Sequence, residues 1–287
     1  VEYAPSQLKH EFPFLSAQNR AGFFFPQVIT VRNADLIKAL KAWLLWCPQV
    51  DLFEHTPVQS FLSHERAALS YEGTVSLEKT VSLENTISLE NTISLENTIS
   101  LNEGTPVHMR TVTGVVTPKG VFSAGHYLMT AGAWTSSLLP NVQMPPIFPI
   151  QGQMLQIQAE PHLLRSVVVD AGRYLIPRKD GKILVGSTVE NTGFRKILTA
   201  KAYQELQQFA YALLPDLAQY PIVAHWCGLR PATQSLLPFV GLLPNFANMA
   251  VASGHFRLGL TLAPFAAYSL SSSLSSMESS NPSFLSL

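Results

Sequence analysis

Residues 224–264 read AHWCGLRPATQSLLPFVGLLPNFANMAVASGHFRLGLTLAP, and the other segments of the chain are organised around this stretch. Its first arginine, Arg230, follows Gly228 and precedes Pro231. The proline stiffens the backbone, and the glycine leaves room for a ligand. An ordinary surface arginine is the alternative, and we favour a ligand-facing side chain because glycine, proline and aromatic residues flank it within an apolar stretch.

The second arginine, Arg257, lies in SGHFRLG, after an apolar strand predicted at 249–252 and before an apolar helix predicted at 258–268. A strand, a glycine-bearing turn and the start of a helix direct backbone N–H groups and the positive end of the helix dipole at one place. An anion or an electron-rich ligand fits such a place. We therefore expect a ligand site here too, again over the alternative of a surface arginine.

Composition limits the classes of protein to which the chain can belong. Its 287 residues are 47% hydrophobic and 13% charged, which indicates a globular fold of one large domain or two medium ones. The 19 basic and 19 acidic residues balance, so charge gives no case for nucleic acid or an anionic membrane as partner. Cys47 and Cys227 form no metal-ligand pattern and are typical of buried thiols in a reducing compartment. We expect a cytoplasmic protein with no bound metal, no signal peptide and no membrane-spanning segment.

Periodicity and turn residues predict a mixed α/β fold with many antiparallel strands. Asn33 is the expected cap of the first long helix, and Asp180 with Gly181 is the expected turn of a hairpin. The predicted elements are a helix at 34–46, a strand at 50–58, strands within 107–129 that turn at 118–120, strands at 147–158, 173–177 and 183–187, a helix at 200–214, and a serine-rich tail beyond Leu270 that frays.

A hexapeptide repeat, TVSLEK to TISL, occupies 74–101. Because six is a multiple of the strand period of two, valine, isoleucine and leucine stay on one face of a strand, whereas a helix would distribute them around its axis. An elongated hairpin or a loop is favoured over a fragment of a β-solenoid. We interpret the repeat as an insertion without chemistry; a role as an adhesion or oligomerisation arm is the weaker alternative.

Six segments together resemble the D-amino-acid oxidase superfamily of FAD-dependent amine oxidoreductases, most closely the glycine oxidases of bacterial thiamine biosynthesis. The segments are FEHTPV (53–58), AGAW (131–134), IQGQML (150–155), YLIPRKDGKILVGST (174–188), CGLRPAT (227–233) and SGHFRLGLTLAP (253–264). They follow the order of the family and cover most of the chain outside the repeat. The G-x-G-x-x-G fingerprint with which the family begins does not occur in these 287 residues. We expect this chain alone to hold FAD weakly, and a chain that begins at Val1 is expected to be a piece of a longer protein.

The resemblance implies a partial FAD-binding Rossmann-like domain, an antiparallel-sheet substrate domain and a hexapeptide-repeat insertion. The implied boundaries are 34–73, 105–140 and 224–275 for the remaining FAD-binding domain, 1–33 and 141–223 for the substrate domain, 74–104 for the insertion and 276–287 for a flexible tail.

The resemblance also implies the roles of particular residues. Arg230 would grip the carboxylate of a small amino acid or amine substrate with a two-point fork, and the phenol of Tyr174 would donate to the same carboxylate. Arg257 would add positive charge near the flavin. The residues implied to contact FAD are Val58, Ala131, Gly132, Gly254, His255, Phe256, Arg257, Leu258, Gly259, Leu260 and Thr261. Gly172, Val189 and Leu258 depart from the glycine oxidase pattern, which leaves the substrate preference open.

The implied reaction is oxidative deamination of glycine, a small D-amino acid or a secondary amine to the oxo acid, ammonia and hydrogen peroxide, with oxygen as electron acceptor. The histidines need no catalytic role in it, because the cofactor performs the difficult step. A homo-oligomer is compatible with the sequence. Two alternatives stay open: a catalytically inactive, truncated remnant of the same fold, and a repeat-bearing structural or interaction protein in which the hexads are the active part.

Overall fold

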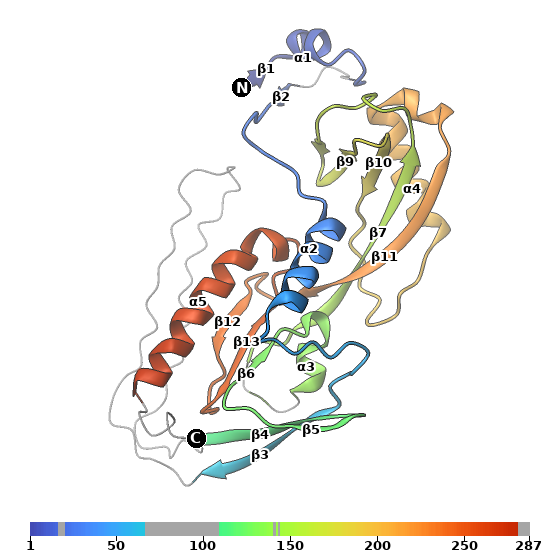
Figure 1. Ribbon diagram of the computed structural model, residues 1–287. Helices are drawn as coiled ribbons and strands as arrows, with labels where there is room; N and C mark the ends of the chain where they lie inside the picture. The colour runs from blue at the N-terminus through green and yellow to red at the C-terminus, as the bar shows by residue number, and fades with distance from the viewer. Residues whose placement is uncertain (17–20, 67–108, 140–141, 143, 281–287) are drawn as a thin grey trace.

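A five-stranded antiparallel sheet forms the centre of the computed structural model, which describes residues 1–16, 21–66, 109–139, 142 and 144–280 (Figure 1). Its strands, in spatial order, are β11 (Ile222–Ala232), β7 (Phe148–Gln158), β10 (Lys182–Gly186), β9 (Arg173–Pro177) and β8 (Val168–Asp170). The turn between β9 and β10 contains Gly181 at a φ of 82°, a left-handed conformation that glycine adopts without strain. The sequence predictions of β7, β9 and β10 and of this hairpin are confirmed, whereas β8 and β11 were not predicted.

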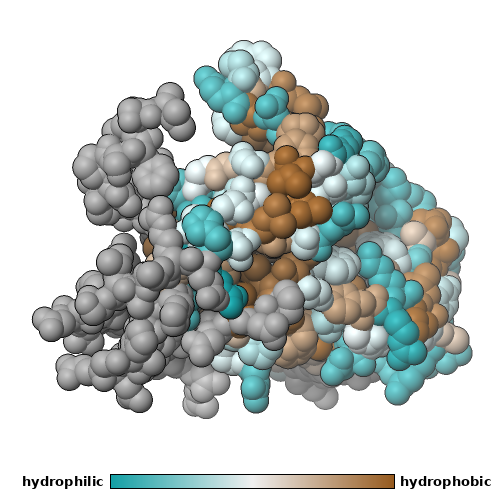
Figure 2. All heavy atoms as spheres, turned by 90° about the horizontal axis from the view of Figure 1, so that it is seen from below, coloured by the Kyte–Doolittle hydropathy of each residue, from teal (hydrophilic) through white to brown (hydrophobic). Residues whose placement is uncertain are grey.

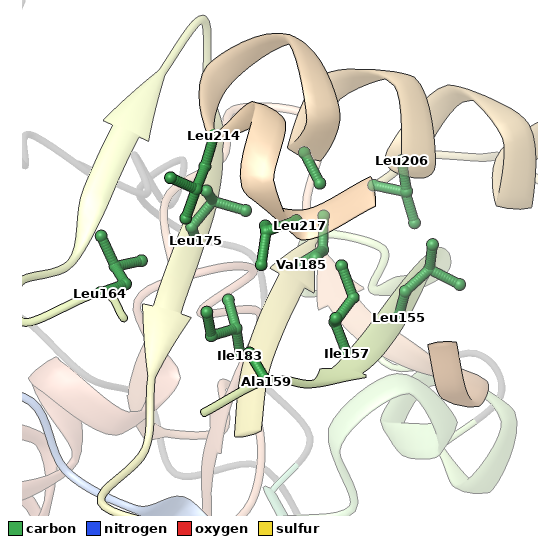
Figure 3. Close-up of a cluster of buried hydrophobic side chains, with 11 residues drawn as sticks. Leu155, Ile157, Ala159, Leu164, Leu175, Ile183, Val185, Leu206, Leu214 and Leu217 are labelled. Atoms are coloured by element: carbon green, nitrogen blue, oxygen red, sulfur yellow. The ribbon is translucent and has the colours of Figure 1, made fainter. Parts of the chain in front are cut away.

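One face of this sheet carries the larger hydrophobic core. Because side chains alternate along a strand, Leu155 and Ile157 of β7 share that face with Val185 of β10, and all three are fully buried. Helix α4 (Ala200–Leu213) covers them with Leu206, and the short 3-10 helix η2 (Pro215–Gln219) adds Leu217 (Figure 3). The opposite face of the sheet is therefore left for other contacts.

Helix α4 starts and stops at residues that the sequence marks. The Thr199 hydroxyl accepts a hydrogen bond from the Ala202 N–H at 3.2 Å and caps the first turn. Ala202, Leu206 and Ala210, spaced four apart, are its buried residues. Pro215 follows and opens η2. The prediction of an amphipathic helix at 200–214 is confirmed to within one residue.

A second sheet, of three strands, contains one pair of parallel strands. β13 (Met249–Ser253) lies between β12 (Phe239–Leu242), which runs antiparallel to it, and β6 (Tyr127–Met129), which runs parallel. β6 leads into the short helices η1 (Gly132–Trp134) and α3 (Thr135–Leu138), and β13 leads into the long helix α5 (Gly259–Ser280). The carboxyl ends of the two parallel strands, and the starts of the helices that follow them, therefore lie on the same side of this sheet.

The third sheet is joined to the second by backbone hydrogen bonds of Arg110 to Asn245 and Ala247, at 2.7 and 2.8 Å, and by one buried amide. It consists of β3 (Ser60–Arg66), β4 (Met109–Thr117) and β5 (Gly120–Phe122), with the predicted turn at 118–120 between the last two. Asn248, next to β13, accepts from the Val112 N–H and donates to the Val112 carbonyl, each at 2.9 Å. This pair of bonds fixes β4 against the second sheet.

The N-terminal segment folds over the edge of the central sheet. It comprises β1 (Glu2–Tyr3), α1 (Pro5–Glu11), β2 (Gly22–Phe23) and α2 (Asn33–Trp46). The Ser16 N–H donates to the Leu213 carbonyl at the end of α4 at 2.9 Å, and Phe14 packs on the core beneath α4. In contrast, α2 has no buried residue, and its predicted apolar stripe is exposed at Ile37 (60%) and Trp43 (59%).

Apolar residues also remain at the surface elsewhere: Figure 2 shows a group of them, surrounded by polar residues, on the face of the molecule seen from below. No helix in the ranges that the structure describes combines the length and the apolar character needed to cross a membrane.

Several expectations differ from the structure, and the repeat at 74–101 lies outside the described residues. Asn33 is the first residue of α2 rather than its cap, because Arg32 occupies the cap position without a side-chain bond. Cys47 and Cys227, expected to be buried, are partly exposed. The strand predicted at 50–58 is wrong: a turn at Glu54 and His55, whose φ is 54°, keeps this segment irregular until β3 starts at Ser60. The helix predicted at 258–268 runs on to Ser280, into the segment expected to fray, because serine tolerates a helix that has already started. Residue 224, the expected start of the last FAD-domain segment, lies within β11, which pairs with β7 in the central sheet. The domain boundaries stay a prediction.

Candidate functional site

One row of residues crosses the face of the central sheet that α4 leaves free. The pairing register places Tyr174 of β9 opposite Gly186 of β10, Gly186 opposite Met154 of β7, and Met154 opposite Trp226 of β11. Directly opposite residues in a sheet project from the same face. The row therefore brings the predicted substrate residue Tyr174 to this face together with an apolar wall.

Gly186 makes room for the tyrosine ring. A Cβ atom at this position would lie 2.6 Å from Cε2 and 2.9 Å from Oη of Tyr174, so the ring lies directly over the glycine. The phenol points along the row toward Met154, with 3.9 Å between Oη and Sδ. A thioether is a weak hydrogen-bond acceptor, which leaves the phenol able to donate to a ligand.

Gly152 makes room for the guanidinium of Arg230 in the same way. A Cβ atom there would lie 2.1 Å from Nη1 and 2.4 Å from Cζ of Arg230. The guanidinium is held by two bonds: Nη1 donates to the Thr188 carbonyl at 3.2 Å, and Nη2 donates to Ser187 Oγ at 2.8 Å. Arg230 has five N–H donors in a fixed fork, so donors remain for a ligand.

The phenol of Tyr174 and the charge of Arg257 both act on the guanidinium of Arg230. Burial lowers the pKa of the Arg230 guanidinium, the phenol of Tyr174 opposes this effect, and the positive charge of Arg257 adds to it. An arginine remains charged in proteins at all ordinary pH values. A half-buried cation beside a phenol and near a second cation is a site for an anion such as a carboxylate.

Arg257 joins two parts of the molecule next to this site. It belongs to the turn between β13 and α5, and its Nη1 donates to the Gly172 carbonyl at 3.5 Å, in the turn that precedes Tyr174. In the same turn the Phe256 N–H donates to the Pro231 carbonyl at 2.7 Å, one residue after Arg230. The two arginines that the sequence singled out are thus brought to one region from different sheets.

The turn contains a glycine, Gly254, whose backbone conformation would be strained for any other residue. Gly254 has a φ of 86°, and a Cβ atom on it would lie 2.8 Å from Thr233 Cγ2. The preceding residue, Ser253, donates through Oγ to the Gly132 carbonyl at 2.9 Å and accepts from Thr135 Oγ1 at 3.0 Å. The expected cofactor residues after β6, Ala131 and Gly132, therefore lie beside those after β13, at the carboxyl ends of two parallel strands, where α/β sheets bind ligands.

The start of α5 fits the electron-rich edge of a flavin. Its opening residues Gly259, Leu260 and Thr261 contribute the first N–H groups of a helix, which point outward along its axis. His255, just before them, has a buried Nε2 without a hydrogen-bond partner among the described residues, and burial lowers the pKa of this imidazole, which is therefore neutral at pH 7. The N–H groups of Phe256 and Leu258 donate to the carbonyls of Pro231 and His255, and the predicted contacts of these two residues with the cofactor stay predictions.

Val58 lies in the segment that leads into β3 of the third sheet, and its predicted contact with FAD stays a prediction. Sequence reasoning missed Gly152, Gly186, Ser187 and Thr188. The signal for the glycines was present, since a glycine within a predicted strand indicates a close approach of another group.

A family model described as FAD dependent oxidoreductase (DAO) matches residues 96–272. The glycine oxidase of Pseudomonas putida is 34% identical over 253 residues, which is 88% of this chain and 57% of that protein. The bifunctional protein ThiO/ThiG of Trichormus variabilis is 40% identical over 169 residues, 58% of this chain and 25% of that protein. The crystal structure of a glycine oxidase from Bacillus cereus superposes with a TM-score of 0.74 at 19% identity, covering 96% of this chain and 65% of that one, which shows a shared fold.

The chain thus spans less than two thirds of each of these relatives. The family match covers more than half of the chain and includes β6, the central sheet and the β13–α5 turn, the elements that form the site. The chain therefore belongs to the DAO family of FAD-dependent oxidoreductases, whose cofactor is FAD.

Proposed function

We propose that this chain provides the substrate-binding part, and part of the flavin-contacting surface, of an enzyme that oxidises glycine, a small D-amino acid or a secondary amine. The products are the oxo acid, hydrogen peroxide and ammonia, or a primary amine in place of ammonia when the substrate is a secondary amine. The observation that carries the proposal is the pairing of the Tyr174 phenol and the Arg230 guanidinium on one face of the central sheet, each over a glycine. Arg257 adds a second cation at that face.

Arg230 binds the carboxylate of the substrate in this proposal. Two of its N–H groups are occupied by Thr188 and Ser187, and the remaining donors present the planar fork that matches a carboxylate. Tyr174 donates its phenol proton to the same carboxylate. The half-buried setting strengthens both contacts, because less water competes for them.

The carboxylate contacts orient the carbon that bears the amine. When bound, FAD supplies the acceptor for a hydride equivalent from that carbon, and oxygen is the final electron acceptor. The N–H groups of Gly259, Leu260 and Thr261 provide hydrogen-bond donors and a positive helix end for the flavin's electron-rich edge. The lowered pKa of His255 keeps this imidazole neutral near pH 7, so it adds no charge there.

Met154 and Trp226 complete a wall beside the two polar groups, which favours a substrate with a small side chain. Glycine is the simplest such amino acid, and glycine oxidase is the name of the Pseudomonas putida relative. We further propose that the product of this reaction is supplied to thiamine thiazole synthesis, in line with the ThiO portion of the bifunctional relative.

An inactive remnant of the fold is the alternative against which this proposal is tested. The two candidates differ in a simple measurement. The purified chain is mixed with FAD, separated from free cofactor, and examined for flavin absorbance and for peroxide release with glycine, sarcosine and D-alanine.

The enzyme proposal predicts that retained flavin is reduced by one of these amines in the absence of oxygen, and that Arg230→Leu raises the KM steeply. Arg165→Leu, on an exposed residue, is the matched control and should leave the KM unchanged. Retained flavin that no amine reduces would support the remnant. An unchanged KM in Arg230→Leu would refute the role of Arg230.

A further inference from the structure

Two fully buried glutamines lie on β7, on the face opposite to the substrate residues. Gln151 and Gln153 have no exposed surface, and they alternate along the strand with Gly152 and Met154. Gln151 donates through Nε2 to the Ile197 carbonyl at 2.9 Å and accepts the Ile197 N–H on Oε1 at 2.8 Å. Buried amides of this kind are retained only when their hydrogen bonds are made.

Both glutamines converge on one carboxylate, that of Glu190. Gln153 Nε2 donates to Oε1 and Oε2 at 2.9 and 3.0 Å, Gln151 Nε2 donates to Oε2 at 3.3 Å, and the Thr188 hydroxyl makes a short bond to Oε1. The backbones of Glu190 and Gln151 exchange two further bonds, at 2.8 and 2.9 Å. The segment 187–190 thereby continues beside β7 as an extension of β10.

Thr188 connects this cluster to the arginine on the other face. Its hydroxyl bonds to Glu190 and also accepts the Gln153 N–H at 2.8 Å. Its carbonyl is the acceptor for Arg230 Nη1, and the preceding Ser187 is the acceptor for Nη2. The two groups that fix the guanidinium thus belong to a segment whose position depends on the Glu190 carboxylate.

We propose that Glu190 is a positioning residue for substrate binding: its carboxylate, held by Gln151, Gln153 and Thr188, fixes the segment 187–190 so that Arg230 lies over Gly152 with its free donors toward the substrate. This inference rests on the proposed function, in which Arg230 binds a carboxylate. Glu190 touches neither the substrate nor FAD in this account and acts only through Thr188 and Ser187.

The charge of Glu190 is what makes it suited to this task. A carboxylate only accepts hydrogen bonds, and it faces side-chain donors from three residues. A glutamine at 190 has one oxygen and an NH₂ group, so the NH₂ would meet a donor. A buried glutamine amide would then lose its partner, and the segment would shift to restore it.

Three variants test the proposal on the isolated chain, without any requirement for flavin. Glu190→Gln removes the charge, Thr188→Val removes the connecting hydroxyl, and Thr188→Ser retains it. Glu160→Gln, on an exposed glutamate two residues after the end of β7, is the matched control. Acetate is the carboxylate probe and acetamide its neutral counterpart. Binding is followed through the ¹⁵N-arginine side-chain NMR signals, with Arg230 assigned by Arg230→Lys.

The expected result is a dissociation constant for acetate that rises about tenfold in Glu190→Gln and in Thr188→Val, the size of one lost charge-assisted hydrogen bond. The Arg230 Nη signals should also average, because the guanidinium rotates once its two acceptors move. Thr188→Ser should bind acetate more tightly than Thr188→Val, because it retains the connecting hydroxyl. Glu160→Gln should bind acetate as the unaltered chain does, and acetamide should bind to none of the variants.

The outcomes separate the two claims. If Arg230→Lys weakens acetate binding but Glu190→Gln and Thr188→Val leave both the affinity and the Arg230 signals unchanged, the positioning role is overturned and the proposed function stands. If Arg230→Lys itself leaves acetate binding unchanged, the carboxylate role in the proposed function fails. Should Glu190→Gln fail to fold, the contrast between Thr188→Val and Thr188→Ser decides: weak binding in both would overturn the proposal.

Discussion

Substituting Gly152 by alanine should move the guanidinium of Arg230 while leaving the sheet intact. The added Cβ would lie 2.1 Å from Nη1 and 2.3 Å from Nη2, and ordinary contacts between such atoms are about 3.5 Å. The guanidinium is the flexible end of its side chain, so it should yield by roughly 1 Å. Its bonds to Ser187 Oγ at 2.8 Å and to the Thr188 carbonyl at 3.2 Å cannot both survive that shift.

We expect this shift of the guanidinium to weaken the binding of a carboxylate. A hydrogen bond to a charged group contributes about 1.5–3 kcal/mol, so the affinity for acetate should fall between about tenfold and a hundredfold. Stability should change by less than about 1 kcal/mol, because alanine also restricts the unfolded chain. Acetate titration monitored by NMR gives the first quantity, and urea unfolding gives the second.

Gly228 supplies the matched control. It lies opposite Gly152 on β11 and shares its face of the sheet, yet a Cβ atom there meets nothing within 4 Å. Gly228→Ala should therefore bind acetate as the unaltered chain does. Equal affinities in the Gly152→Ala and Gly228→Ala variants would refute the conclusion that the guanidinium occupies the space above Gly152.

Three further predictions concern stability. Gly254→Ala should lower the free energy of unfolding by about 1–3 kcal/mol, because its φ of 86° and the methyl of Thr233 at 2.8 Å both oppose a Cβ; an unchanged urea midpoint would contradict this. Leu206→Ala should cost about 2–5 kcal/mol, since Leu206 is fully buried, and a smaller loss would mean that the cavity collapses. Burial lowers the pKa of both His225 and His255 below the ordinary value, so the unfolded chain takes up more protons in acid; stability should fall as the pH drops through about 6.5, and a flat profile in urea unfolding would oppose this.

The sequence predicted β7, β9 and β10 of the central sheet because their signals are local, and it did not predict β8 or β11. Alternation in β7 and the Asp180–Gly181 turn depend on neighbouring residues alone. The strand predicted at 50–58 from the same kind of signal is wrong. The segment has apolar alternation, but the turn at His55 and the proline at position 57 prevent a strand.

The candidate site was predictable only in part, because its contacts join distant positions. Tyr174 and Arg230 followed from a family resemblance, whereas the approach of Arg230 to Gly152 depends on the register between β11 and β7. The bonds of Gln151 and Gln153 to Glu190 depend on how the chain continues after β10. Two glutamines within an apolar strand are a visible signal of a buried polar cluster, but their partners cannot be identified without the fold.

The central claim is that Tyr174 and Arg230 hold one carboxylate together. A double-mutant cycle tests it most directly: the affinity for acetate is measured in the unaltered chain, in Tyr174→Phe, in Arg230→Lys and in the double variant. The account predicts that the two substitutions are coupled by at least about 0.5 kcal/mol, because each residue loses its effect once the other has released the ligand. If the losses of acetate-binding free energy in the two single variants add up to the loss in the double variant, the shared carboxylate is contradicted, and the two side chains bind separate ligands.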